Sequence, residues 1–267
     1  MLTDSMWSVL LPLFQRPHKP RGRPKADTRL LLEGVLWVLR TGAPWRDLPD
    51  DFGPWQTVYH HFRIWDREGT IDRAFERLRD TGHVTNEVWS IDGTLVRAHR
   101  CAAGAGKKGG RGEPEEHALG RSRGGFGTKA HLVVDATGLP LHVHLTGGQV
   151  HEAKAFDELA NDLDALMENV RPQFVAGDKA YGANKIRAWL NQRKVTPVIP
   201  TKSNEKRVET FAKDVYRRRN VVERCIGWLK ECRRVATRYE KLASRFLCMF
   251  KLAGLVLWLR AGFSDKA

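Results

Sequence analysis

The sequence predicts a mixed α/β protein in which an all-helical region, residues 1–85, precedes an α/β region, residues 86–267. Two patterns predict this division. Apolar residues in the first region recur every three to four positions, as on one face of a helix. In the second region, short β-rich runs alternate with helical runs, which is typical of strands and helices packed in layers. A chain of 267 residues is long enough for one large domain or two small ones.

Three helices are predicted within residues 1–85. "DTRLLLEGVLWVLRTG" has Asp27 as its N-cap candidate and ends at Gly42, and "TIDRAFERLRD" has Thr70 as its cap candidate. Between them, "GPWQTVYHHFRIWDREG" carries one apolar stripe: Trp55, Val58, Tyr59, Phe62 and Trp65. Short helices joined by a tight turn fit a helix-turn-helix module, and equally any small helical bundle. The upstream "KPRGRPK", residues 19–25, is either a solvated linker or a basic arm that reaches a groove of nucleic acid.

The α/β region has the predicted element order β-β-β-α-β-α-β, followed by helices. The strands are "EVWSIDGTLVRAH", two runs around the turn "DATG", then "PQFVAGD" and "VTPVIP". The helices between them are "EAKAFDELANDLDALMENV" and "ANKIRAWLNQRK", and a C-terminal helix is expected over residues 239–263. A strand hairpin followed by alternating units predicts a mixed sheet covered by helices. This element order is that of the ribonuclease-H-like fold.

Residues 100–127 form a basic, glycine-rich segment between the first two strands. The segment has little apolar surface to bury, so one interpretation is a disordered loop. The other is a loop that becomes ordered on nucleic acid, because a loop this long in a compact domain is usually functional or disordered. Both interpretations stay open from the sequence.

The chain is strongly basic, with a formal net charge of +14 and a pI near 9.9. Residues 202–241 carry 13 Lys or Arg against 6 Asp or Glu, a net +7, which is half of the whole excess. Such a charge favours a polyanionic partner, and nucleic acid is the commonest one.

Other features argue against a secreted or membrane protein. The four cysteines, Cys101, Cys225, Cys232 and Cys248, form no C-x-x-C pair, and we expect Cys225 and Cys232 to be small buried apolar side chains. The beginning, "MLTDSMWSVLLPLF", has no basic leader, so no signal peptide is expected. The apolar run over residues 246–259 is interrupted by Lys251 and is shorter than the about 20 residues that cross a bilayer. We therefore expect a soluble, cytoplasmic protein.

Two aspartates lie at positions where an acidic side chain suggests a functional role. Asp92 is inside the first predicted strand, where a carboxylate needs a partner or a role. Asp178 ends the strand "PQFVAGD", and sites in open sheets gather at the carboxyl ends of strands. Each has an alternative, because Asp92-Gly93 is compatible with a turn and Asp178 with a helix cap.

A third carboxylate, Glu223, lies in the basic run "YRRRNVVERCIGWLK", residues 216–230. At about 100° per residue, one predicted helix places four polar residues within about 60° of one another: Tyr216, Arg219, Glu223 and Lys230. The opposite arc is apolar and includes Trp228. Arg219 and Glu223 are i, i+4, so a surface ion pair would also explain them. To reach the sheet's carboxylates with this polar stripe, the helix is expected at the edge of the sheet, with residues 246–259 covering its apolar face.

The spacing Tyr216-x2-Arg219-x3-Glu223-x6-Lys230 resembles the Y-R-E-K motif of bacterial insertion-sequence DDE transposases, in the superfamily of families four and five. "SIDGTLVRAHR", "ALGRSRGGFGTKAHLVVD", "LTGGQVHEAKAF" and "GDKAYG" are similar to blocks of the family-five group. "APWRDLPDDFGPWQTVYHHFRIWDREG" resembles that group's N-terminal helical domain. The resemblance implies a helical DNA-binding domain, residues 1–85, and a ribonuclease-H-like catalytic domain, residues 86–267.

The same resemblance implies a catalytic triad that holds two Mg²⁺ ions, for which Mn²⁺ would substitute: Asp92, Asp178 and Glu223. Three carboxylates suit this chemistry, because Mg²⁺ prefers oxygen ligands and phosphoryl transfer gains from a metal pair. DNA contacts are implied for Arg219 and Lys230, and packing or DNA positioning for Tyr216. We further expect DNA contacts from three basic residues in the similar blocks: Arg123, Lys129 and Lys179.

The expected function is Mg²⁺-dependent cleavage and strand transfer of double-stranded DNA at the terminal inverted repeats of an insertion sequence. The protein would join these ends to target DNA, act as a homodimer on DNA, and associate with the bacterial nucleoid when bound. Two alternatives remain: a ribonuclease-H-fold nuclease of repair or RNA turnover, and a domesticated, non-catalytic DNA-binding protein.

Some further residues have weaker functional interpretations. His142 and His144 point to one face of a strand and His151 begins the next helix, but no further zinc ligand is evident. We therefore expect surface histidines, or histidines that support the metal ligands without binding the metal. Glu152 is expected to cap that helix rather than approach the metals. Trp189 and Trp228 are expected in the core rather than stacked on a displaced base.

Overall fold

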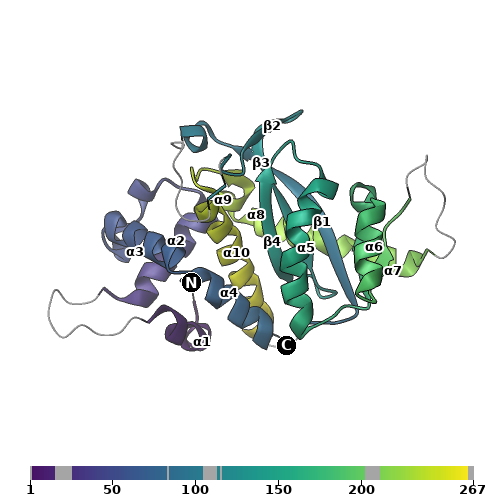
Figure 1. Cartoon of the computed structure of the whole chain (residues 1–267). Coiled ribbons are helices and arrows are strands. Elements are labelled where there is room, and N and C mark those ends of the chain that lie inside the picture. The colour runs from purple at the N-terminus through teal and green to yellow at the C-terminus, as the bar shows by residue number, and fades with distance from the viewer. Residues whose placement is uncertain are drawn as a thin grey trace.

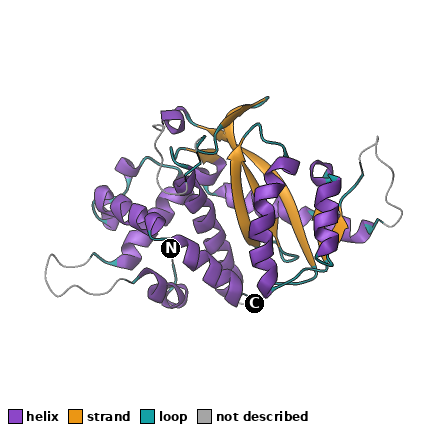
Figure 2. Cartoon of the chain, in the orientation of Figure 1, coloured by secondary structure: helices purple, strands orange, loops and turns teal. Residues whose placement is uncertain are grey.

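The computed structural model describes residues 2–15, 26–82, 84–104, 113–114, 116–201 and 211–263. The basic stretch at residues 19–25 and residues 105–112 of the glycine-rich segment lie outside these ranges. The described part has one mixed sheet with helices on both of its faces and a group of helices beside it (Figure 2).

The sheet confirms the predicted fold class. Its main strands are β1 (Val88–Ala98), β3 (Gly125–Val134), β4 (Pro140–Gly147), β5 (Phe174–Gly177) and β6 (Thr196–Val198). β4, β3 and β1 are antiparallel neighbours, and β5 and β6 follow on the other side of β1, parallel to it. The spatial order β4-β3-β1-β5-β6 is that of a ribonuclease-H-like sheet. Two short strands add to it, β2 (Gly120–Ser122) on β3 and β7 (Thr237–Arg238) on β1.

Helices cover both faces of the sheet. Figure 1 shows α5 (Glu152–Asn169) in front of the strands and α8 (Asn220–Glu231) behind them. α6 (Asn184–Gln192) packs on β6, and α7 (Lys213–Arg218) packs on β5. α8 contacts both β1 and β3, so it lies across the middle of the sheet. The expectation that this helix lies at the edge of the sheet is therefore wrong. Its apolar side chains Val222, Cys225 and Leu229 join the core between sheet and helices.

The single helix predicted for residues 216–235 is interrupted twice. α7 ends at Arg218, α8 begins at Asn220 and ends at Glu231, and α9 (Arg233–Ala236) follows. Trp228, expected in the core, is 42% exposed instead. Trp189 is partly buried, with its ring edge-on to Phe156.

The N-terminal region is helical, as predicted. The three expected helices are α2 (Thr28–Thr41), α3 (Trp55–Arg67) and α4 (Thr70–Thr81), and a helix that was not predicted, α1 (Asp4–Phe14), precedes them. Asp27 caps α2 through the amides of Arg29 and Leu30, and Gly42 ends it in the left-handed conformation, at φ 72°. Thr70 is the first residue of α4, and its cap position is Gly69. A left-handed backbone at position 69, φ 65°, explains this shift, because glycine adopts it without strain.

The C-terminal helix α10 (Ala243–Phe263) joins the helical region to the sheet. It contacts α4 on one side and β4 on the other, and the Trp258 indole donates to the carbonyl of Pro140. It also contacts α8, as expected for the segment that covers that helix. At 21 residues and with an apolar stretch of mean hydropathy 1.6, α10 has the length and composition of a membrane span. The expectation that this segment is too short to cross a bilayer is therefore wrong. However, 56% of this apolar stretch is buried within the protein, as in the core helix of a globular domain.

Candidate active site

Asp92 lies in the middle of the central strand. β1 continues without a turn to Ala98, so the Asp-Gly pair is part of the strand, with Asp92 opposite Leu132 of β3. One carboxylate oxygen of Asp92 accepts the backbone amide of Gly93 at 2.8 Å. The other oxygen is left to face side chains outside the strand.

Asp178 follows directly after β5, the neighbour of β1. Ile91 pairs with Gly177, so the next residues along the two parallel strands are Asp92 and Asp178. The Asp178 carboxylate accepts the amide of Ala180 at 2.9 Å, so it also caps a short 3₁₀ turn. Burial raises the pKa of Asp178, and the negative charges of Asp92 and Glu152 add to the rise. The two aspartates are therefore electrostatic neighbours.

Glu223, in the first turn of α8, approaches the aspartates through Arg219. The Arg219 guanidinium lies 2.8 Å from Asp92 Oδ2 and 2.6 Å from Glu223 Oε1. The i, i+4 pair proposed as an alternative thus exists, but its arginine is shared with the strand carboxylate. Glu223 is 59% exposed, whereas Arg219 and Asp92 are 14% and 18% exposed. Glu223 therefore forms the solvent-facing side of this group.

Tyr216 and Lys230 flank the same group on the helical segments. The Tyr216 ring lies 5.3 Å from that of Phe211 and 5.8 Å from the Arg219 guanidinium carbon, so it packs on both. Lys230 donates to the carbonyl of Leu95 at 3.2 Å, and burial lowers its pKa. Arg219 and Lys230 thus contact β1 at Asp92 and Leu95, whereas Tyr216 and Glu223 contact Arg219.

The opposite face of the same strands carries a second polar group, which contains Lys129, Glu152 and a residue that the sequence pattern did not single out, His131. Lys129 on β3 donates to Glu152 at 2.7 Å and to the carbonyl of Val150 at 2.8 Å. Glu152 therefore pairs with a lysine instead of capping α5. Burial alone would raise the pKa of Glu152, but the Lys129 contact outweighs it and the pKa is lowered.

His131 completes this second group. Its ring nitrogens lie 3.0 Å from the Tyr181 hydroxyl and 3.0 Å from the Thr146 hydroxyl. Burial, followed by the positive charges of His144 and Lys129, lowers the pKa of His131 to about 4. Tyr181 follows Asp178 by three residues, so His131 supports the turn that presents this aspartate. A histidine inside a buried strand, "KAHLVV", was the available sequence signal.

The other residues predicted to contact DNA differ in their exposure to solvent. Arg123, in the turn between β2 and β3, and Lys179, next to Asp178, are exposed. Lys129 is only 15% exposed, and the contacts described for it are internal. The expected hard-oxygen metal site has a matching donor set, because Asp92, Asp178 and Glu223 all supply carboxylate oxygens.

The sheet order and this acidic group define a protein of the ribonuclease-H-like class. A family model described as "Transposase DDE domain" matches residues 85–258, and another described as "Putative transposase of IS4/5 family (DUF4096)" matches residues 2–75. The chain therefore belongs to the DDE transposase family, within the IS4/5 group.

Similar proteins include two putative transposases of bacterial insertion sequences. The chain is 33% identical over 134 residues to the "Putative transposase for insertion sequence element IS6501" of Brucella ovis, covering 50% of this chain and 98% of that protein. It is 29% identical over 147 residues to the "Putative transposase for insertion sequence element IS402" of Burkholderia cepacia, covering 53% and 67%. An uncharacterized Sinorhizobium fredii protein, y4sN, is 36% identical over 111 residues, covering 41% and 87%.

Two solved structures show a distant likeness. The catalytic core domain of BIV integrase matches 68% of this chain and 86% of its own, with a TM-score of 0.34 and 14% identity. The piggyBac transposase synaptic complex with hairpin DNA matches 76% and 50%, with a TM-score of 0.39 and 14% identity. At these TM-scores, the ribonuclease-H-like fold rests on the strand order described above.

Proposed function

We propose that this protein is a DNA transposase that binds the ends of its insertion sequence and catalyses Mg²⁺-dependent strand cleavage and strand transfer. The single observation that carries the proposal is the convergence of Asp92, Asp178 and Glu223 around Arg219, on the sheet of a DDE transposase family member. These three residues are separated widely in the chain, and only the fold brings them to one place.

Asp92, Asp178 and Glu223 would hold the divalent ions, Mg²⁺ or its substitute Mn²⁺. When bound, the ions would supply the positive charge that phosphoryl transfer needs at its attacking and departing oxygens. Asp92 is anchored by the Gly93 amide and Asp178 by the Ala180 amide, so their carboxylates are oriented before any ligand arrives. Glu223 is the exposed member and is free to adjust.

Arg219 has a second task in this proposal. Without DNA it neutralises Asp92 and Glu223, and its own pKa is raised by these contacts although burial alone would lower it. With DNA bound, the same guanidinium would turn from the carboxylates to a phosphate oxygen, which it can bind through two parallel hydrogen bonds. Lys230 would serve as a further cation beside the cleaved bond, and Tyr216 would hold Arg219 in position.

The DNA would extend from this site over the exposed basic residues Arg123 and Lys179. Lys129 would have to leave Glu152 to join them. Residues 1–85 would bind the terminal repeats, and synapsis of two ends would require a homodimer on DNA. The proposed location is the bacterial cytoplasm, at the nucleoid when DNA is bound.

The test is cleavage of DNA that carries the terminal repeats flanking the gene, in Mg²⁺. Glu223→Gln, which keeps the size of the side chain, is expected to lose cleavage and strand transfer while it retains end binding. Glu231→Gln, at the far end of the same helix, is the matched control and is expected to cleave normally. Retained cleavage in Glu223→Gln would remove this residue from the active site.

The same substrates separate the two rival functions. A nuclease of repair or RNA turnover would cut without preference for the terminal repeats. A non-catalytic DNA-binding protein would bind the repeats without cutting them.

A further inference from the structure

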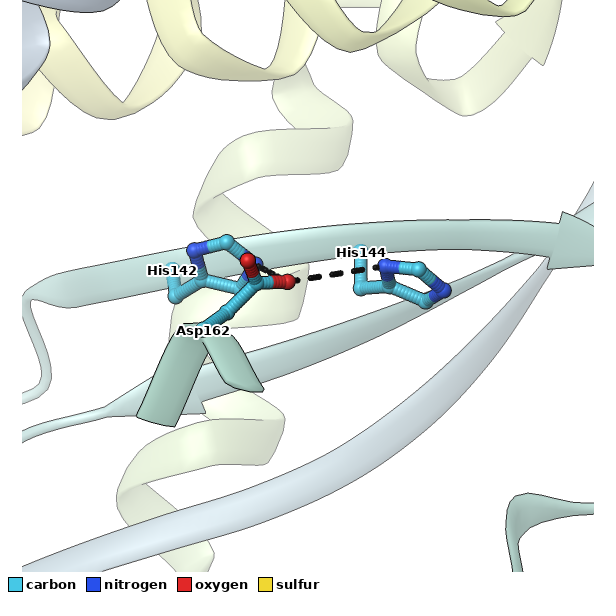
Figure 3. Close-up of side chains that lie close together, drawn as sticks. All are labelled: His142, His144 and Asp162. Carbon is cyan, nitrogen blue, oxygen red and sulfur yellow. Dashed lines mark ion pairs between the residues drawn. The ribbon is translucent and has the colours of Figure 1, made fainter. Parts of the chain in front are cut away.

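A cluster of two histidines and an aspartate lies on the sheet face that α5 covers. His142 and His144 are alternate residues of β4, so their side chains project to the same face. The carboxylate of Asp162, on α5, points toward both histidines (Figure 3). Its Oδ2 atom lies 3.0 Å from His142 Nε2 and 3.8 Å from His144 Nδ1. The ligand atoms of the three residues all lie within 4.8 Å of one another.

These spacings are close to those of a tetrahedral zinc site. Zinc–nitrogen and zinc–oxygen bonds of about 2.0–2.1 Å place neighbouring ligand atoms about 3.3–3.4 Å apart in a tetrahedron. The two distances from Asp162 Oδ2, 3.0 and 3.8 Å, lie on either side of this value. An ion could be accommodated by small rotations of these side chains, without movement of β4 or α5.

The surroundings also resemble those of a metal-bound histidine. His144 Nε2 lies 3.1 Å from Glu158 Oε2, one turn before Asp162 on α5. A ligand histidine usually has a carboxylate on its second nitrogen, which orients the ring and leaves the first nitrogen to bind the metal. Within the described part of the chain, the Nε2 atoms of His142 and His144 are buried without a hydrogen bond of good geometry. The contact of His142 Nε2 with Asp162 and that of His144 Nε2 with Glu158 are therefore close but poorly directed.

We propose that His142, His144 and Asp162 bind one transition-metal ion, with Zn²⁺ preferred. Two imidazoles and one carboxylate favour Zn²⁺ over Mg²⁺, which prefers oxygen ligands alone. Three protein ligands leave a fourth position for water. The ion would cross-link α5 and β4. This structural role does not depend on the proposed transposase activity.

The charges around the cluster are compatible with such an ion. Asp162 is half-buried, which would raise its pKa, but its histidine neighbours and then Lys251 outweigh this effect and lower it. Lys251 already has an acidic partner in Asp72, so it does not depend on Asp162 for neutralisation. The His144 ring lies 6.2 Å from that of His131, so the ion would also steady the group that supports Asp178.

The alternative is that protonated histidines and the carboxylates form ordinary ion pairs. Co²⁺ binding distinguishes a metal site from ordinary ion pairs, because tetrahedral Co²⁺ in a Zn²⁺ site has an intense visible absorption. The experiment uses the full-length Glu223→Gln protein, in which the proposed Mg²⁺ site is impaired. Co²⁺ titration is followed by absorption, Zn²⁺ is added as competitor, and bound metal is counted by elemental analysis.

One equivalent of Zn²⁺ that displaces Co²⁺ is expected. Asp162→Asn and His142→Gln should each weaken binding at least tenfold, whereas His60→Gln, an exposed histidine outside the cluster, should not. Zn²⁺ should also raise the Tm of the parent and not that of Asp162→Asn. Absence of a tetrahedral Co²⁺ spectrum, or equal affinity in all these variants, would overturn the proposal.

Discussion

The guanidinium of Arg219 donates to Asp92 Oδ2 at 2.8 Å, although 127 residues separate the two in the chain. This contact connects the helical segment behind the sheet to the middle of its central strand. It also places a fixed positive charge where the proposed divalent ions would bind. Arg219 therefore competes with the proposed divalent ions for these carboxylates.

Removing this arginine is predicted to strengthen metal binding and weaken DNA binding. In Arg219→Gln, the carboxylates of Asp92 and Glu223 lose their neutralising partner, so Mn²⁺ should bind the DNA-free protein severalfold more tightly by calorimetry. Binding of the terminal repeats should weaken, since a phosphate contact is lost. Arg217→Gln, an exposed arginine paired with Asp214, is the control for charge alone. Weaker Mn²⁺ binding in Arg219→Gln would show that the arginine assists the metal instead of competing with it.

Arg123 and Lys179 are predicted to contact phosphates. Each neutralised phosphate contributes about 0.9 to the slope of log affinity against log salt concentration. Arg123→Ala and Lys179→Ala should therefore each reduce the magnitude of this slope by about 1, to a similar extent for any DNA sequence. Binding measured by fluorescence anisotropy at several salt concentrations gives the slope. A slope equal to the parent's in both variants would place the DNA elsewhere.

The stability of the protein is predicted to fall in mild acid because of His131. Its pKa is about 4 in the folded state, against 6.5 for an ordinary histidine. As pH falls through 6.5, the unfolded chain binds a proton that the folded protein excludes, so stability is lost between pH 6.5 and pH 4. At 1.36 kcal/mol per pKa unit, the loss from this residue is about 3 kcal/mol. Urea unfolding at pH 7 and pH 4.5 measures the difference.

The matched variant for this prediction is His131→Gln, which retains hydrogen-bonding groups toward Tyr181 and Thr146. It should unfold with a weaker pH dependence over this window, whatever its stability at pH 7. Parallel pH profiles for the variant and the parent would mean that other groups cause the acid sensitivity.

The buried pair of Arg234 and Glu240 is predicted to be necessary for stability. Their side chains are 6% and 5% exposed, and Arg234 also donates to the carbonyl of Ala43 at 2.6 Å. Glu240→Ala leaves a buried arginine without its carboxylate, which costs about 3–5 kcal/mol. Urea unfolding should show this loss, and the double variant Arg234→Met with Glu240→Leu should recover part of it. A loss below 1 kcal/mol in Glu240→Ala would mean that water or a backbone carbonyl replaces the carboxylate.

Local patterns in the sequence were sufficient for most of the elements. Alternation and helical periodicity predicted β1, β3, β4 and α5 in their correct order, because these elements bury long, regular apolar faces. Asp27 and Gly42 marked the ends of α2, since capping depends on neighbouring residues alone. The short strands β2 and β7 were missed, because they form only through pairing with β3 and β1.

Tertiary structure alone decided how the polar residues are partnered. The helical stripe placed Arg219 beside Glu223, but the shared contact with Asp92 depends on where α8 crosses the sheet. The sequence predicted that Glu152 caps a helix, but β3 places Lys129 beside it. The sequence also predicted a buried Trp228, but the position of α8 exposes its ring to solvent. Spacing along a chain determines which side chains share a face, whereas packing in three dimensions determines what that face meets.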